Sequence, residues 1–253
     1  GKSYTYVVDK VEDFIRKKGA MPAFPMDLSV NDIAAHYCPY IVDDNILKKG
    51  DLVKLDIGVH VNGCVADNAC TVELGTNKWK GLINASKDAC LAACEMAIPD
   101  AQIRNIGKIV EQTIKEAGFQ PITNLSGHGV EQWIVHAPPT IPNYDNGNEA
   151  TLKEGMHIAI EPFATTGAGS VKDGKGCGVY MMQQKKPLRL DSAKKLMLKI
   201  EKDYHTLPFT ERWLRDVSNV KFLLGLLERE GVLKQYTVLP EKKGGMVSQY
   251  ENT

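Results

Sequence analysis

Residues 52–74 decide the fold of this 253-residue chain, and they read LVKLDIGVHVNGCVADNACTVEL. Apolar residues alternate with other residues on both sides of Asn62-Gly63, which predicts two β-strands over residues 52–60 and 64–74. Asn-Gly between two such runs indicates a two-residue hairpin turn, because both residues adopt the positive φ that this turn requires. The stretch therefore predicts an antiparallel hairpin with a defined register.

The register of this hairpin brings two carboxylates together. With that turn, Asp56 lies opposite Ala69, and Asp67 lies opposite Gly58. Residues 67 and 69 point to the same side of the sheet, because side chains alternate along a strand. The two acids are therefore diagonal neighbours on one face, with backbones about 7–8 Å apart.

Carboxylates at this spacing repel each other, and Leu55, Ile57, Val65 and Ala66 make their strands largely apolar. Such a pair is tolerated where a proton or a metal ion neutralises it. The alternative is a polar strand face, open to solvent, that carries two unrelated acids. The hairpin alone leaves both interpretations open.

Other candidate ligands also lie in apolar surroundings. Glu161 ends an apolar run that begins at Met156, and Glu251 follows the segment 247–250. The histidines in apolar stretches are His36, His128 and His136. The ordinary alternatives are strand-end or surface acids and hydrogen-bonded core histidines. Four acids with one imidazole would suit two divalent ions, and a hydroxide held between two metals hydrolyses peptides or esters.

The rest of the chain predicts a mixed α and β protein. Apolar residues at helical spacing and Ala-rich runs indicate helices, and Pro and Asp clusters indicate loops. The predicted elements are helices over 5–18, 80–97 and 100–117, a loop over 21–33, a strand over 156–163 and a mainly helical segment over about 191–235.

Charge and composition exclude several classes of function. The 31 basic and 31 acidic side chains balance, so the net charge gives no general attraction to nucleic acid or to an anionic membrane. No run of 18 apolar residues and no signal-peptide pattern is present, so we expect a cytoplasmic protein with no membrane partner. The chain opens on Gly-Lys-Ser without an initiator Met, which suggests a truncated or processed start.

Two further patterns point away from other chemistries. The six cysteines form no C-x-x-C pair, which favours reduced thiols over a zinc ribbon or disulfides. Residues 169–176 nearly match a phosphate-binding loop, but Gly176 stands where that motif needs Ser or Thr. We therefore expect a flexible glycine-rich loop there.

Motifs spread along the chain resemble those of type 2 methionine aminopeptidases, and their sequences are most similar to those of archaeal members. They are Ala23-Phe24-Pro25, Ala34-Ala35-His36-Tyr37, Lys54-Leu55-Asp56-Ile57-Gly58-Val59-His60, Ala66-Asp67, Asn124-Leu125-Ser126-Gly127-His128, Val135-His136-Ala137, Ala159-Ile160-Glu161-Pro162-Phe163 and Gln249-Tyr250-Glu251. The match runs in order through nearly the whole chain, so it is more specific than any single motif.

The resemblance implies the creatinase/aminopeptidase fold, also called pita-bread. This is an α/β (α+β) fold with two pseudo-symmetric halves around a curved antiparallel sheet. Residues 1–253 would form a single catalytic domain with a helical type 2 insertion at about 190–235. The family has a helix before Gly1 and a closing strand after Glu251, so we expect both ends to be truncated.

The same resemblance implies a role for each candidate residue. The metal ligands would be Asp56, Asp67, His128, Glu161 and Glu251, holding two divalent ions drawn from Co, Mn, Fe, Zn and Ni. The remaining catalytic and substrate-binding residues would be His36, His136 and Phe24, with Phe24 contacting the methionine side chain. Glu161 would relay a proton, while the two histidines would steady the oxyanion.

The implied function is removal of the N-terminal methionine from nascent polypeptides, in which a hydroxide activated by two metals attacks the first peptide bond. The implied protein is a monomer with transient ribosome contact and no specific nucleic acid. Pro138 departs from the family, which has Gly there, and Asn252 stands where the family has His. Two other functions stay open: a proline-specific dipeptidase or aminopeptidase P, and a non-catalytic relative that acts as a scaffold.

Overall fold

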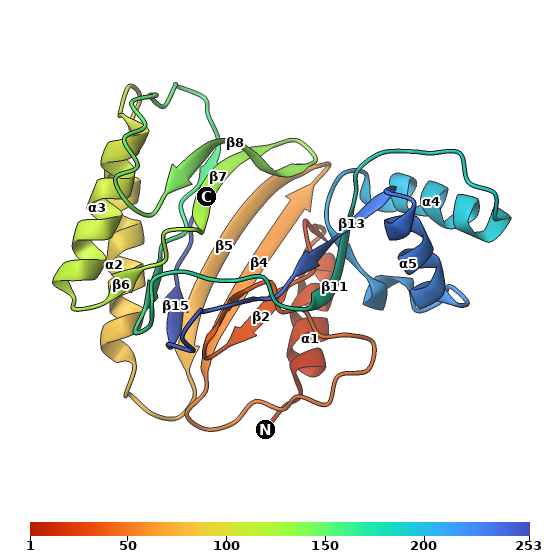
Figure 1. Ribbon diagram of the computed structural model, residues 1–253, viewed down its shortest axis with the longest axis horizontal. Helices are drawn as coiled ribbons and strands as arrows, with labels where there is room; N and C mark the ends of the chain where they lie inside the picture. The colour runs from red at the N-terminus through yellow and green to blue at the C-terminus, as the bar shows by residue number, and fades with distance from the viewer.

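The structure is a computed structural model that describes residues 1–253 (Figure 1). The helices are α1 (Tyr4–Lys17), α2 (Lys80–Met96), α3 (Ile103–Glu116), α4 (Asp191–Tyr204), α5 (Val220–Arg229) and the short 3-10 helix η1 (Glu211–Leu214). The strands are β1 (Met21–Pro22), β2 (Asp27–Val30), β3 (Ile33–Ala35), β4 (Leu52–Val61), β5 (Cys64–Glu73), β6 (Gln120–Pro121), β7 (Ser126–Glu131), β8 (Ile134–Pro142), β9 (Ile158–Ala159), β10 (Phe163–Thr165), β11 (Gly176–Met182), β12 (Phe209–Thr210), β13 (Leu233–Thr237), β14 (Leu239–Pro240) and β15 (Val247–Gln249).

The predicted hairpin is confirmed as the antiparallel pair β4–β5, which runs through the middle of the molecule (Figure 1). Its turn residues both have positive φ, +51° at Asn62 and +83° at Gly63. Asp56 pairs with Ala69, and Gly58 pairs with Asp67, as the turn predicts. The register therefore places both acids on one face of the sheet.

The loop predicted over residues 21–33 is wrong, because β2 lies inside it and pairs with β4. All four residues of β2 are buried. Pro25 and Asn31 flank a strand of only four residues, so its alternation of apolar and polar residues is too short to predict it. Pairing with β4, rather than local sequence, stabilises this strand.

Helices α2 and α3 pack side by side at one end of the molecule (Figure 1), and they confirm the two helices predicted there. Their apolar faces enclose a core with side chains of the neighbouring sheets, including Leu52, Ile141 and Ile160. The strand predicted over 156–163 is broken into β9 and β10. Pro162 lies in the break and has no N–H to offer a sheet.

Helices α4 and α5 lie at the opposite end, and with η1, β11 and β13 they surround a separate apolar core (Figure 1). The segment predicted to be mainly helical contains α4, η1 and α5, but the short strand β12 interrupts it and its end forms strand β13. Helix α1 covers the β2–β4 sheet through Val8 and its neighbours.

A buried ion-pair network joins this helical end to α1. Arg212 of η1 is 4% exposed, and Glu12 of α1 is 1% exposed. The Arg212 guanidinium contacts the Glu12 carboxylate at 2.7 Å and the Asp9 carboxylate at 2.5 Å. The Trp213 indole N–H also donates to Glu12, at 2.7 Å.

Three expectations from the sequence can be compared with the fold. All six cysteines are free, which agrees with the reduced thiols that the sequence predicts. No helix combines the length and the apolar character needed to cross a membrane. Residues 169–176 form an irregular loop that leads into β11, with no helix beginning there.

Candidate metal centre

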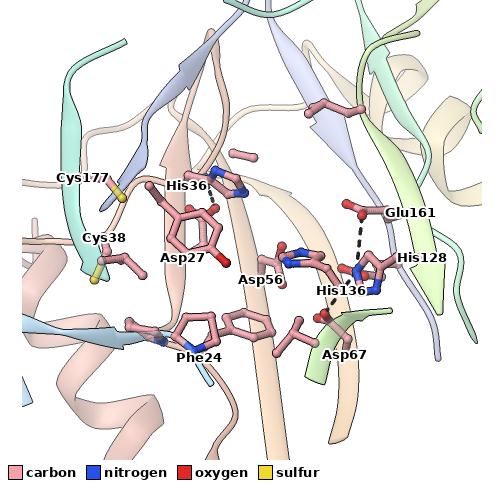
Figure 2. A pocket seen from close by; sticks show the side chains of 18 of the residues that line it. Phe24, Asp27, His36, Cys38, Asp56, Asp67, His128, His136, Glu161 and Cys177 are labelled. Carbon is pink, nitrogen blue, oxygen red and sulfur yellow. Dashed lines mark hydrogen bonds and ion pairs between the residues drawn. The ribbon is translucent and has the colours of Figure 1, made fainter. Parts of the chain in front are cut away.

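The hairpin supplies two carboxylates to a pocket on one face of the sheet (Figure 2). Asp56 comes from β4, and Asp67 comes from β5, where it is 3% exposed. The Oδ1 atom of each is buried and has no hydrogen-bond partner. Buried carboxylate oxygens are costly without a partner, so these two atoms indicate a position for a cation.

His128 on β7 points its Nε2 atom toward the acids. Nε2 lies 3.8 Å from Asp67 Oδ2 and 3.6 Å from Glu161 Oε1. The other ring nitrogen, Nδ1, is 3.0 Å from the Gly129 carbonyl and therefore carries the proton of the neutral ring. This tautomer leaves the Nε2 lone pair free, as in histidines that bind metals.

Glu251 completes the cluster at the end of the chain. Its backbone exchanges two hydrogen bonds with Ala69 of β5, and its side chain is 3% exposed. The buried Gln249 amide donates to Asp56 at 3.0 Å and to Glu251 at 3.5 Å, so it orients both carboxylates. One ligand atom each from Asp67, His128 and Glu251 lies within 4.8 Å of the others.

Electrostatics also favour a cation in this cluster. Burial raises the pKa of Asp56 to about 6. Burial and the neighbouring acids raise the pKa values of Asp67, Glu161 and Glu251 well above their ordinary range. Four ionised carboxylates at this site repel each other unless protons or cations neutralise them. Oxygen-rich donors with one imidazole fit divalent metal ions, so these residues suit a metal centre.

The remaining predicted residues line the same pocket, a cavity of about 230 Å³. His36 donates from Nδ1 to the Thr237 carbonyl at 3.2 Å, and its ring meets the Tyr236 ring edge-on. The His136 ring lies 4.5 Å from the His128 ring, centre to centre. Desolvation by the pocket walls, together with His128 and His36, lowers the pKa of His136, so its ring is neutral near pH 7. Phe24 lies against the backbone of Gly58.

Asp27 also lies in this pocket, and reasoning from the sequence missed it (Figure 2). It is 7% exposed and stands opposite Asp56 in the β2–β4 pair. Burial and Asp56 raise its pKa to about 7. The alternation of apolar Met26, Leu28 and Val30 with polar residues 27 and 29 is a signal for a short strand, but it does not show that the polar side of that strand is buried.

Lys54 is a second missed residue, on β4 two positions before Asp56. It is 1% exposed, and its Nζ donates to the carbonyls of Asn31 at 2.9 Å and Val247 at 3.0 Å. Burial lowers its pKa to about 7. Lys54 thus ties β15, which leads to Glu251, to the central sheet.

Comparison with known proteins places this geometry in context. The profile of metallopeptidase family M24 matches residues 1–205. A methionine aminopeptidase from Archaeoglobus fulgidus is 44% identical over 247 residues, 98% of this chain and 84% of that protein.

Two solved structures resemble the fold. A methionine aminopeptidase from Rickettsia prowazekii has a TM-score of 0.69 at 22% identity and covers 98% of this chain and 80% of its own. A prolidase from Pyrococcus furiosus has a TM-score of 0.56 at 31% identity, and the alignment covers 65% of this chain and 48% of the prolidase. The likeness to the first extends over almost the entire chain, whereas the likeness to the second stops short of it.

Proposed function

The chain belongs to metallopeptidase family M24, and from this premise we infer that it is a methionine aminopeptidase, which removes N-terminal methionine from polypeptides. The predicted family and its pita-bread fold are confirmed by the profile match and by the likeness to solved relatives. The structural observation that carries the activity is the cluster of buried acids and one imidazole at the floor of a partly apolar pocket.

Membership of the family implies divalent metal binding. We propose two ions, held by Asp56, Asp67, His128, Glu161 and Glu251. The two unpartnered oxygens, one from each hairpin acid, support this ligand set. When bound, divalent cations polarise a carbonyl oxygen and lower the pKa of water. The donor set accepts Co, Mn, Fe, Zn or Ni and does not select among them.

The protein's own groups would handle protons and orient the substrate. The Glu161 side chain is 14% exposed and has a raised pKa, so its carboxyl group suits holding a proton and passing it to the leaving amine. His36 donates a hydrogen bond from Nδ1 to the Thr237 carbonyl, which leaves Nε2 as an acceptor for a substrate N–H rather than as the oxyanion donor that the resemblance implies. His136, neutral and accessible from the pocket, is placed to hydrogen-bond the reacting carbonyl.

The apolar part of the pocket supports methionine as the residue that is removed. Its walls include Phe24, Pro25, Val179 and Tyr236. These side chains form a small apolar space beside the acid cluster, which suits an unbranched thioether side chain. The first peptide bond of the substrate would then lie over the acids.

The replacement Asp67→Asn tests the ligand set and the activity together. We expect this variant to lose bound metal and at least about a hundredfold in turnover of Met-Ala-Ser, because one anionic ligand is removed. Asp88→Asn, on the exposed face of α2, is the matched control and should keep both. Full metal content with unchanged turnover in Asp67→Asn would refute the assignment.

The same assay separates the alternatives. A wild-type chain that cleaves Ala-Pro peptides in preference to Met-Ala-Ser would be a proline-specific enzyme. A folded chain that binds no metal and cleaves neither peptide would be a scaffold. We propose further that the substrates are nascent polypeptides in the cytoplasm. The enzyme would act as a monomer and would contact the ribosome transiently.

We also propose that residues 1–253 form one catalytic domain and that α4, η1 and α5 are an insertion into it. The separate apolar core of these helices supports an added unit. Their position beside Pro208 and Tyr236, both of which line the pocket, suggests that the insertion helps to shape the substrate site.

A further inference from the structure

His36 reaches the pocket from an unusual backbone conformation. Its φ is +66°, in the left-handed region that non-glycine residues seldom occupy. Residues persist there only when surrounding contacts hold them. The position of the His36 ring therefore depends on whatever fixes the backbone at residue 36.

The contacts that fix it come from two side chains of β2. The Asp27 carboxylate accepts the His36 backbone N–H through Oδ2. Through Oδ1 it accepts the Ser29 hydroxyl at 2.6 Å. The Ser29 hydroxyl oxygen in turn accepts the Tyr37 backbone N–H at 3.2 Å. Two consecutive N–H groups of this segment are thus held by one pair of side chains.

The pair is itself rigid. Asp27 is 7% exposed and Ser29 is 0% exposed, and both project from the same side of β2. Leu28, between them, donates its N–H to the Tyr37 carbonyl at 2.8 Å. Residues 36–37 are therefore held by hydrogen bonds to the backbone of Leu28 and to the side chains of its two neighbours, Asp27 and Ser29.

We propose that Asp27 and Ser29 are positioning residues that aim the His36 ring at the substrate. The inference rests on the proposed function, since it assigns His36 a task in the cleavage of Met-peptides. Each oxygen of the Asp27 carboxyl group accepts from one donor, the Ser29 hydroxyl at Oδ1 and the His36 backbone N–H at Oδ2. Asn at residue 27 would keep one acceptor for the His36 N–H, whereas Ala would keep none.

A double-mutant cycle tests the proposal. With Met-Ala-Ser and added Mn²⁺, Asp27→Ala should lower kcat by roughly ten- to a hundredfold, with a smaller change in KM, because His36 is misplaced. Adding Asp27→Ala to His36→Ala should cause almost no further loss, because both changes act through one ring. Asp27→Asn should restore most of the activity.

Losses that multiply in the double variant would overturn the proposal. Val110→Ala, in the buried core of α3, is the control for lower stability alone and should leave kcat unchanged. Should Asp27→Ala fail to fold, Ser29→Ala removes only the hydroxyl and should give a smaller loss in kcat that also disappears in the His36→Ala background.

Histidine ¹⁵N–¹H spectra provide a readout that does not depend on activity. The signal that His36→Ala removes identifies His36, and it should show the proton on Nδ1. In Asp27→Ala that signal should shift or broaden, and in Val110→Ala it should not. An unmoved His36 signal would refute the positioning role, whereas a wild-type chain that cannot cleave Met-Ala-Ser would instead refute the proposed function.

Discussion

Gly58 is the residue at which the central hairpin packs against Phe24, a side chain that lines the substrate pocket. It pairs with Asp67 across the hairpin, and its backbone lies against the Phe24 ring. A Cβ added at this residue would overlap that ring. The absence of a side chain at Gly58 therefore allows the Phe24 ring to take its place in the wall of the proposed methionine-binding pocket.

Gly58→Ala should therefore change substrate binding more than catalysis. The displaced ring narrows the pocket, so we expect KM for Met-Ala-Ser to rise roughly tenfold, with a stability loss of about 1–3 kcal/mol from overpacking. Gly225→Ala on α5, where an added Cβ meets nothing within 4 Å, should leave KM unchanged. Steady-state kinetics on both variants measure the difference, and an unchanged KM in Gly58→Ala would contradict this role of Phe24.

Single residues differed in how readily the sequence revealed them. Asp56 and Asp67 could be paired in advance because the Asn-Gly turn fixes their register. Asp27 and Lys54 could not, because their burial depends on strands that are distant in sequence, β4 for Asp27 and β15 for Lys54. Local patterns carry no information about such partners, and polar residues are exposed by default.

At the scale of elements, one buried carboxylate holds two loops together. Glu241, 1% exposed, accepts the backbone N–H groups of Ala168 at 2.5 Å, Lys243 at 2.7 Å and Gly245 at 2.9 Å. Burial alone would raise the pKa of Glu241, but these hydrogen bonds outweigh it and lower the pKa below its ordinary value. The loop before β11 is thereby fastened to the segment that leads to β15.

This carboxylate should make stability depend on pH in the acid range. Because the pKa is lower in the folded state, the stabilisation is complete above the unfolded-state value and is lost as pH falls through the folded value. We expect Glu241→Gln to lose about 1–3 kcal/mol of unfolding free energy at pH 7. The difference in unfolding free energy between this variant and wild type should shrink below pH about 4.5. Urea unfolding at several pH values would measure it. Glu154→Gln, at an exposed position, is the control; a gap that widens in acid would contradict the assignment.

Elements also differed in how far the sequence determined them. The hairpin and the helices α2 and α3 followed from patterns that extend over ten or more residues. The short strands β2, β9 and β10 did not, because a few residues beside a proline give no reliable period. Their stability comes from pairing with other strands, which only the folded chain provides.

At the scale of the whole molecule, the acid cluster makes stability depend on metal and pH together. Burial raises the pKa of Asp27 to about 7 and that of Asp56 to about 6, so without metal these two groups bind more protons in the folded chain than in the unfolded chain between pH 4 and these values. Their contribution to stability therefore falls as pH rises through that range. Bound cations would replace the protons and remove the dependence.

Thermal unfolding can test this linkage. In a chelating buffer, we expect the Tm to fall between pH 5 and pH 8 by at least roughly 2–4 °C, which corresponds to about 1 kcal/mol in a chain of this size. With Mn²⁺ or Co²⁺ added, the Tm at pH 8 should recover. A Tm that rises with pH in the chelating buffer would contradict a cluster of raised pKa values.

The ion-pair network between Arg212 and Glu12 has a consequence for how the molecule comes apart. If the helical end melted alone, Glu12 would lose the Arg212 guanidinium and the Trp213 indole N–H that it binds in the folded chain. Breaking a buried ion pair by removing one partner costs several kcal/mol. Separating the helical end from α1 and its sheet therefore costs free energy, although the two parts have distinct apolar cores. Unfolding should be cooperative across both, so that neither half persists as an independent intermediate.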